Sequence, residues 1–210
     1  MTSALNSPGF GNFGLAPDGY VWTSRGGSVN KIDPKTGKYL EQYPFERISG
    51  TYDNLISKDG NFWAGGQWPG NLIGLLDIRT GKLEEIETRS RISSPAKGGF
   101  DWEGNAWFGG RGGALIKLDV KTLRTKEYFP PTPYVTFYEA MPDKNGEIWA
   151  GAQHGGRLVR FNPRTERWIE YVLPEPYAHN RRTWIDHSTD PVTVWYVDHN
   201  GYMVRIQPLE

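Results

Sequence analysis

Short runs of alternating apolar and polar residues follow one another along the whole chain. Residues 157–161 (Arg-Leu-Val-Arg-Phe) and 167–172 (Arg-Trp-Ile-Glu-Tyr-Val) are typical, and glycine, proline, aspartate or asparagine separates such runs. In a β-strand, successive side chains point to opposite faces, which gives an apolar and polar pattern with a period of two. The alternation therefore predicts many short β-strands. No helical period of useful length is present. The sequence therefore indicates an all-β fold.

Five tryptophans mark a repeat within this pattern. They recur at intervals of 41, 44, 42 and 46 residues, as Trp22, Trp63, Trp107, Trp149 and Trp195. A turn that ends in glycine comes three residues before each of the first four, and the same units carry a hairpin turn that begins with Asp or Asn, at Asp33, Asp77, Asp119 and Asn162. Asp and Asn accept hydrogen bonds from turn amides, and glycine tolerates positive φ. Three markers in one phase indicate tandem units of four antiparallel strands.

Tandem four-stranded units of about 42 residues are typical of β-propeller blades. We expect a single domain, 1–210, with repeats at approximately 10–50, 51–94, 95–134, 135–180 and 181–210. In the fourth repeat the strands are expected at 135–141, 147–152, 157–162 and 167–173. The small residues after each tryptophan would let inner strands approach the propeller axis, and the tryptophan would pack between neighbouring blades.

The fifth repeat is incomplete. The chain ends where the other repeats begin their third turn, so the outer strand is missing. Residues 1–9 would supply that strand if the protein forms a five-bladed ring with weak closure. Alternatively, the chain is the C-terminal part of a longer propeller with further blades upstream.

Two sets of connections leave opposite ends of a four-stranded meander. The turns between the first and second strands, and between the third and fourth, are uniform. The connections between the second and third strands, and from one repeat to the next, vary, as in 25–28, 67–70, 111–113, 153–156 and 198–201. Binding residues commonly lie on variable loops of a rigid scaffold, so we expect the functional face on the variable side.

Several polar residues are expected near the channel mouth on that face. Alignment of the first strands on their tryptophans brings equivalent positions together, namely Asn12, Asp53, Lys97, Glu139 and Arg182. Tyr52 and Tyr138 each precede one of the acids. The variable loops add Arg25, Arg111, Gln153, His154, Asp198 and His199. Either a ligand pocket or a solvated polar rim would account for such a ring of mixed charge.

All four histidines lie in the last third of the chain. His154 and His199 occupy matching loops of adjacent repeats, so we expect them to approach each other. With Glu139 or Asp198 they would be able to bind a divalent cation such as Mg²⁺ or to perform acid–base chemistry. The alternative is that they are ordinary exposed loop histidines, and His187 is expected on the opposite face.

Composition excludes several classes of protein. Lys plus Arg equals Asp plus Glu at 24 each, which disfavours a broad basic surface for nucleic acid or anionic lipid. The absence of cysteine excludes disulfides and cysteine-ligated metals. No apolar run approaches about 18 residues and no export signal is visible, so we expect a soluble protein, periplasmic or secreted if it derives from a longer precursor. Motifs of serine hydrolases, phosphate loops, zinc peptidases and dinucleotide folds are missing.

The repeat motifs also carry a resemblance. With Asp-Gly-x-x-Trp in its blades and strand endings such as Glu170-Tyr171, the chain resembles the virginiamycin B lyase (streptogramin lyase) propellers. It is nearly as similar to the propeller repeats of bacterial sensor ectodomains. The lyase resemblance implies a seven-bladed ring, of which five units would be present. It also implies an enzyme that opens a cyclic depsipeptide by metal-assisted elimination, with His and Glu near the channel.

The catalytic motifs of that family are hardly matched. Its blades typically read Trp-Phe-Thr-Glu, and the positions of that Glu are here Arg25, Gly66, Gly110, Ala152 and Asp198. Its catalytic blades carry Pro-His-Gly on the first strand, where this chain has Gly11, Tyr52, Ala96, Tyr138 and Arg181. Only Asp198 retains an acid, so we do not expect the antibiotic lyase activity.

The residues support three functional hypotheses. The leading one is a non-catalytic module that binds a small molecule or a protein through Arg25, Tyr52, Asp53, Lys97, Arg111, Tyr138, Gln153 and Arg182. The second is a metal-dependent lyase or hydrolase that uses Mg²⁺ and the residues His154, His199, Glu139 and Asp198. The third is a partial propeller completed by further blades upstream.

Overall fold

The described part of the chain is built from β-strands alone. The computed structural model describes residues 13–174 and 178–209, and these residues contain no helix. The all-β prediction is therefore confirmed. In chain order the strands form five antiparallel meanders, which we call blades 1 to 5.

The blades have the following strands. Blade 1 contains β1 (Gly14–Leu15), β2 (Val21–Ser24), β3 (Ser28–Ile32) and β4 (Tyr39–Pro44). Blade 2 contains β5 (Leu55–Ile56), β6 (Phe62–Gly66), β7 (Leu72–Asp77) and β8 (Lys82–Glu87). Blade 3 contains β9 (Pro95–Phe100), β10 (Ala106–Gly110), β11 (Leu115–Asp119) and β12 (Arg124–Tyr128). Blade 4 contains β13 (Thr136–Phe137), β14 (Glu139–Pro142), β15 (Ile148–His154), β16 (Arg157–Asn162) and β17 (Arg167–Val172). Blade 5 contains β18 (Thr183–Asp186), β19 (Thr193–Val197) and β20 (Met203–Ile206).

The strand boundaries follow the sequence pattern closely. In blade 4 the expected first strand is split into β13 and β14, and the other three strands lie where the alternation predicted them. Blade 5 has three strands in the described residues, which agrees with the prediction that its outer strand is missing. The closing strand proposed for residues 1–9, and the candidate Asn12, lie outside the described residues.

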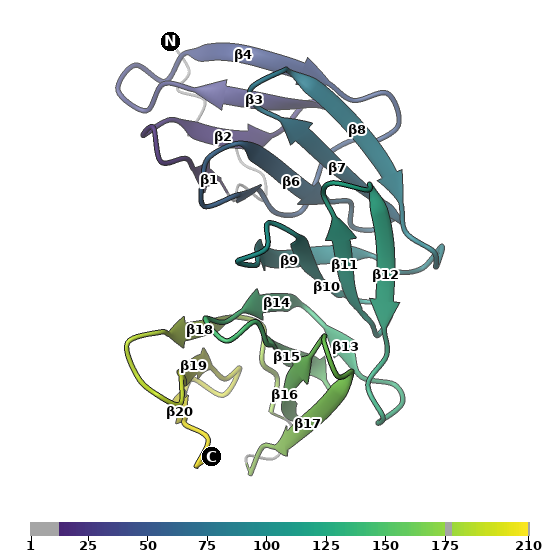
Figure 1. Cartoon of the computed structure of the whole chain (residues 1–210), viewed down its shortest axis with the longest axis vertical. Coiled ribbons are helices and arrows are strands. Elements are labelled where there is room, and N and C mark those ends of the chain that lie inside the picture. The colour runs from purple at the N-terminus through teal and green to yellow at the C-terminus, as the bar shows by residue number, and fades with distance from the viewer. Residues whose placement is uncertain (1–12, 175–177, 210) are drawn as a thin grey trace.

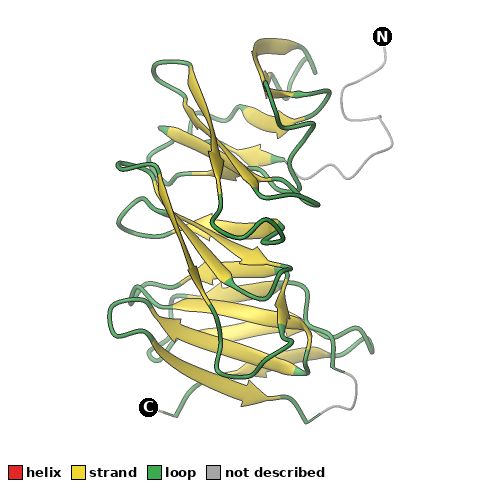
Figure 2. Cartoon of the chain, turned by 90° about the vertical axis from the view of Figure 1, so that its right-hand side faces the viewer, coloured by secondary structure: helices red, strands yellow, loops and turns green. Residues whose placement is uncertain are grey.

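The blades follow one another along an open arc. Figure 1 shows blade 1 at one end of the molecule and blade 5 at the other, with blades 2, 3 and 4 between them. Figure 2 shows the same succession of sheets from the side. The arc places the variable connections of neighbouring blades next to one another.

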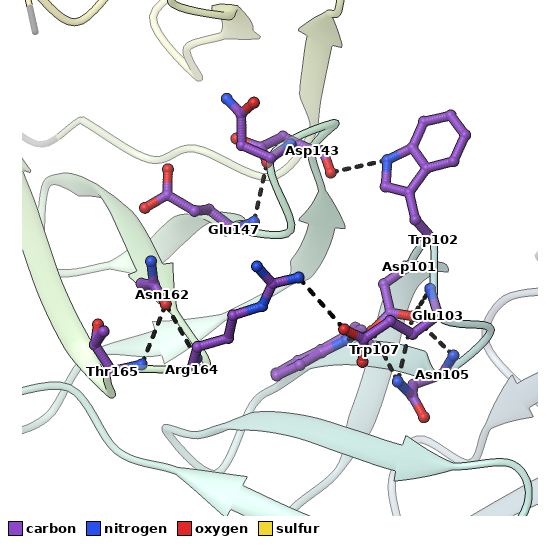
Figure 3. Close-up of polar contacts among 11 residues, drawn as sticks. Asp101, Trp102, Glu103, Asn105, Trp107, Asp143, Glu147, Asn162, Arg164 and Thr165 are labelled. Atoms are coloured by element: carbon purple, nitrogen blue, oxygen red, sulfur yellow. Dashed lines mark hydrogen bonds and ion pairs between the residues drawn. The ribbon is translucent and has the colours of Figure 1, made fainter.

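The turns between the first and second strands hold the blade tryptophans in blades 3 and 4. The indole N–H of Trp107 donates to Asp101 Oδ2 at 2.8 Å, and that of Trp149 donates to Asp143 Oδ2 at 2.9 Å. The other oxygen of each carboxylate accepts backbone N–H groups of its own turn, among them those of Asn105 and Glu147 (Figure 3). One acid six residues before the tryptophan thus closes the turn and satisfies the buried indole.

Four of the five repeat tryptophans lie in the cores between blades, as predicted, whereas Trp195 is only partly buried and belongs to none of the hydrophobic clusters. Trp22, Trp63, Trp107 and Trp149 have no exposed surface. Trp107 belongs to a hydrophobic cluster that joins blades 3 and 4, and Trp149 to one that joins blades 4 and 5. Such fully buried indoles contribute a large share of the hydrophobic stabilisation of each interface.

Blades 3 and 4 are also joined by backbone pairing. Strands β9 and β14 pair in parallel, with Lys97 opposite Glu139, so the two blades form one continuous sheet. A Cβ atom on Gly109 would come within 2.5 Å of the backbone nitrogen of Glu139. Glycine is therefore required at this close approach, in keeping with the expectation that small residues after the tryptophan let inner strands converge.

Candidate functional site

The variable connections meet on one face of the arc, as predicted. The backbone N–H of Phe45 donates to Gly27 O, that of Arg111 to Ser94 O, and that of Leu173 to Gly156 O. Each bond joins a loop between second and third strands to a connection between blades. We call the surface that these two sets of connections form the loop face.

Four of the aligned first-strand residues form a row of alternating charge. Lys97 Nζ lies 3.4 Å from Asp53 Oδ1, and Arg182 Nε lies 3.3 Å from Glu139 Oε1. The pairing of β9 with β14 places Lys97 beside Glu139 and so links the two ion pairs. Lys97 and Glu139 are buried, whereas most of the Arg182 side chain is exposed. The row crosses from blade 2 to blade 5.

Glu139 is the most perturbed acid of this row. Its Oε2 accepts the backbone N–H of Thr183 at 2.7 Å. Burial nevertheless dominates and raises the pKa of Glu139 to about 7, against the opposing effects of Arg182 and of the Thr183 N–H. A buried carboxyl group with a pKa near neutrality is a candidate for binding or for proton transfer.

An aromatic group lies next to this row. The hydroxyls of Tyr52 and Tyr138 are 2.7 Å apart, and the Tyr52 ring also makes an edge contact with Trp68. Burial, and then the hydrogen bond with Tyr52, raise the pKa of Tyr138, which keeps this phenol neutral. The guanidinium of Arg111 lies 4.8 Å from the Trp68 ring centre. Trp68 was not singled out from the sequence, although it lies in a loop that was recognised as variable.

Three histidines form a second group on the loop face. The ring centres of His154 and His179 are 5.2 Å apart, and those of His179 and His199 are also 5.2 Å apart. His154 and His199 thus each lie next to His179, which no repeat motif marks as a site residue. Burial and then the charge of Arg181 lower the pKa of His179, with smaller effects of the other two histidines and of Arg111. His154 Nδ1 also lies 2.9 Å from the hydroxyl of Thr136.

Several buried polar residues near the histidines in sequence have side-chain atoms without a hydrogen-bond partner among the described residues. Gln153, Asn180, Thr183 and Asp198 are all buried, and each has at least one side-chain polar atom with no hydrogen-bond partner among the described residues. Both amide atoms of Asn180 are in this state, as is His179 Nε2. Buried polar atoms are usually paired, because an unmade hydrogen bond costs about 1–3 kcal/mol. Such a concentration at one boundary, between blades 4 and 5, indicates a site for polar molecules.

The remaining predicted residues are placed as follows. Arg25 lies in the blade 1 loop, where its carbonyl accepts a hydrogen bond from Asn30. Asp198 begins the β19–β20 turn and accepts the N–H of Asn200 with one oxygen. His187 lies in the β18–β19 turn, which belongs to the set of connections on the opposite face.

The four proposed catalytic residues are divided between two groups. Glu139 contacts Arg182 and Thr183, whereas the rings of His154 and His199 each lie 5.2 Å from that of His179. Within residues 13–174 and 178–209, no three His, Asp or Glu side chains are arranged to hold a metal ion. The described donors therefore do not fit a divalent cation bound by this set. The same residues contain no helix long and apolar enough to span a membrane.

The fold and the repeated blades define a β-propeller. No protein-family model and no curated protein matches the sequence. Among solved structures, the chain is similar to a catalytically inactive virginiamycin B lyase from Staphylococcus aureus with quinupristin. The TM-score is 0.81 at 15% identity, over 94% of this chain and 66% of the lyase chain.

Two further structures give the same result. A streptogramin B lyase structure matches with a TM-score of 0.76 at 19% identity, over 94% of this chain and 68% of that chain. The β-propeller domain of Myceliophteria thermophila Cps50 (Swd1) matches with a TM-score of 0.74 at 14% identity, over 95% and 65%. The lyase-like propeller fold is thus shown, and the chain spans about two thirds of the length of the chains that it matches. At this identity the similarity concerns the fold and not the activity.

Proposed function

We propose that the chain is a non-catalytic binding module that takes a small polar carboxylic acid on the loop face of blades 3 to 5. The observation that carries this proposal is the group of buried, unpartnered polar side chains beside the three histidines. A ligand that enters this group supplies hydrogen bonds that these side chains do not make with other described residues. Binding sites commonly combine such a small number of polar groups with aromatic walls.

Charge indicates the class of ligand. Glu139 is engaged by Arg182 and Thr183, and Asp53 by Lys97. The cationic groups around His179, by contrast, include Arg111 and Arg181, whose charges lower its pKa. Their positive charge favours an anionic group on the ligand.

The unpartnered atoms complete the description of the ligand. Gln153 Oε1 and Asp198 Oδ2 are acceptors, so they require N–H or O–H groups on the ligand. The amide of Asn180 offers both a donor and an acceptor. A carboxylic acid that also carries a hydroxyl, amino or amide group satisfies this set. The ring of Trp68 and the paired Tyr52 and Tyr138 provide apolar surface nearby.

A thermal-shift titration with citrate, serine and glutamine tests the proposal. We expect at least one of these compounds to raise the melting temperature of the wild type in a saturable way. The double change Arg111→Ala and His154→Ala should abolish that rise. Arg164→Ala, in the hairpin turn of the opposite face, is the matched control and should not affect it. A rise that depends on Arg164 instead would show that the faces are wrongly assigned.

A metal-dependent lyase or hydrolase is the second candidate function. It is favoured by one observation, the pKa of about 7 of Glu139, since this value suits a group that takes up and releases a proton near neutral pH. In its ionised form Glu139 would accept a proton from a substrate that displaces the exposed Arg182 side chain. Since the described donors do not converge on a metal position, no step is assigned to Mg²⁺.

A further inference from the structure

A hollow of about 550 Å³ opens between blades 2 and 3, among the uniform turns of the face opposite the loop face. We call it the turn hollow. Its apolar lining includes Phe62, Phe100 and Val120, which belong to or pack against one hydrophobic cluster. The turn between β5 and β6 and the turn between β9 and β10 complete its walls. A hollow of this size and character is suited to a small organic molecule.

Trp102 is an unusual residue at the edge of the turn hollow. In blades 1 to 4, the turn between the first two strands is closed by a glycine N–H that donates to the carbonyl three residues earlier. The second residue of this turn is, in chain order, Pro17, Lys58, Trp102 or Lys144. The turn therefore does not require an aromatic residue. Trp102 nevertheless lines the hollow and leaves 59% of its surface exposed.

The contact of Trp102 with the next blade does not require an aromatic ring either. Its indole N–H donates to Asp143 O at 3.0 Å, which joins the turns of blades 3 and 4 (Figure 3). Lys144 has the same turn position in blade 4, and its Nζ donates to Thr189 O of the blade 5 turn at 2.7 Å. A lysine thus makes the same kind of bridge. What Trp102 adds is an aromatic ring whose orientation is held at the hollow.

The acids that line the turn hollow already have partners. Asp59 and Asp101 accept hydrogen bonds from neighbouring side chains with both of their carboxylate oxygens. Glu103 forms an exposed ion pair with Arg164 at 3.5 Å (Figure 3). These carboxylates are therefore less suited to bind a cationic ligand.

Two cations of the turn hollow are not paired in this way. The ammonium of Lys58 lies over the ring of Trp102. Partial burial lowers the pKa of Lys58, against the opposing effect of the Asp101 charge. In the described part of the chain, no carboxylate lies within ion-pair distance of Lys58 or of Lys121. Both lysines line the hollow, so its uncompensated charge is positive.

We infer that the turn hollow binds a small planar aromatic carboxylate. Trp102 and Phe62 supply ring surfaces against which an aromatic ring packs, and the lysines supply charge-assisted hydrogen bonds to the carboxylate. Lys58 moves from the indole face to the carboxylate when the ligand ring takes its place. This inference concerns the opposite face from the proposed function and does not depend on it.

Calorimetric titration with three matched compounds tests the chemistry of the ligand. Cinnamate carries both an aromatic ring and a carboxylate, cinnamamide keeps the ring without the charge, and cyclohexylpropionate keeps the charge without the aromatic ring. We expect saturable binding of cinnamate at one site, at least about tenfold tighter than binding of either other compound. An absence of saturable cinnamate binding at millimolar concentration would overturn the inference. So would equal affinities for cinnamate and cinnamamide.

Two variants test the place of binding. Trp102→Lys installs the residue that blade 4 uses at this turn position, so it keeps a group that reaches the next turn and removes the ring. Lys58→Met removes the charge and keeps an apolar side chain. Both positions are exposed, so we expect both variants to fold. Each should weaken cinnamate binding by at least about tenfold, and Lys58→Met should leave the weaker binding of cinnamamide unchanged.

Two controls separate the turn hollow from other sites. Lys144→Met changes the same turn position outside the hollow and should leave cinnamate binding unchanged. The double change Arg111→Ala and His154→Ala on the loop face should also leave it unchanged. Loss of cinnamate binding in this double variant, or its full retention in Trp102→Lys, would overturn the inference.

Discussion

The carboxylate of Glu139 in blade 4 accepts the backbone N–H of Thr183 in blade 5 at 2.7 Å. This bond fastens the end of the variable connection between the two blades to a buried inner strand. The same connection carries His179 and Asn180, which lie in the proposed ligand site. Glu139 is therefore a positioning residue for that site as well as part of the charged row.

Glu139 should make the stability of the protein depend on pH. Its pKa is about 7 in the folded protein and has an ordinary value of 4.5, so folding binds a proton over this interval. The contribution of Glu139 to the free energy of unfolding should be largest below pH 4.5, decrease by up to about 3 kcal/mol as the pH rises to about 7, and then level off. Chemical denaturation at a series of pH values measures this. Glu139→Gln should remove the slope, whereas the exposed Glu166→Gln should retain it.

Lys97, the buried cation of the charged row, should contribute more to the free energy of unfolding than an exposed lysine does. Lys97 pairs with Asp53 and lies beside Glu139, so Lys97→Met leaves Asp53 without this partner and removes a nearby positive charge that favours ionised Glu139. We expect a loss of about 3 kcal/mol at pH 8 and a smaller loss at pH 5, where Glu139 is protonated. Urea denaturation gives both values. Lys126→Met, which breaks an exposed pair with Glu166, is the control and should have little effect. Equal effects of the two changes would refute the role of burial.

Asp143, which accepts the hydrogen bond of the Trp149 indole, should contribute strongly to the stability of blade 4. Asp143→Ala removes the acceptor of the Trp149 indole and of the N–H groups of Asn145 and Glu147. Because these groups are buried or partly buried, we expect a destabilisation of about 2–3 kcal/mol, measured by thermal or urea unfolding. Asp18→Ala is the control, since Asp18 closes an exposed turn and has no indole partner. A small effect of Asp143→Ala would show that the indole bond adds little.

Much of the fold could be predicted because its signals are local. Each repeat carries the same kind of turn residues and the same alternation of apolar and polar residues. These local signals are sufficient to predict the repeat marked from Trp22 to Trp195 and the turns at Asp33 and Asp77. The charged row from Asp53 to Arg182 could be anticipated for the same reason, because its members occupy equivalent places in successive repeats.

The rest of the site depends on contacts that no repeat encodes. The parallel pairing of Lys97 with Glu139 arises only when two blades pack. His179 and Asn180 lie in a connection whose described residues form no strand, so no register relates them to His154 and His199. Trp68 lies in a variable loop, but it is not one of the repeat tryptophans and no repeat motif marks it as a site residue. The raised pKa of Glu139 follows from the burial of its carboxyl group, and the sequence alone does not predict that burial.

Calorimetry separates the two candidate functions. Mg²⁺, Mn²⁺ and Zn²⁺ are titrated into the wild type and into His154→Ala. Since Glu139 is held in the charged row and His154 lies beside His179, we expect no saturable binding of Mg²⁺ at millimolar concentration. Saturable binding that His154→Ala abolishes would favour the metal-dependent enzyme over the binding module.

The site itself is most directly tested by the histidine side chains. Nitrogen-15 NMR resolves the rings of His154, His179, His199 and His187, and His187 serves as an internal control because its turn belongs to the opposite set of connections. Titration with citrate, serine and glutamine should shift the first three rings in a saturable way for at least one compound and leave His187 unchanged. If none of the three compounds moves the loop-face rings, or if His187 alone responds, the proposed site is wrong.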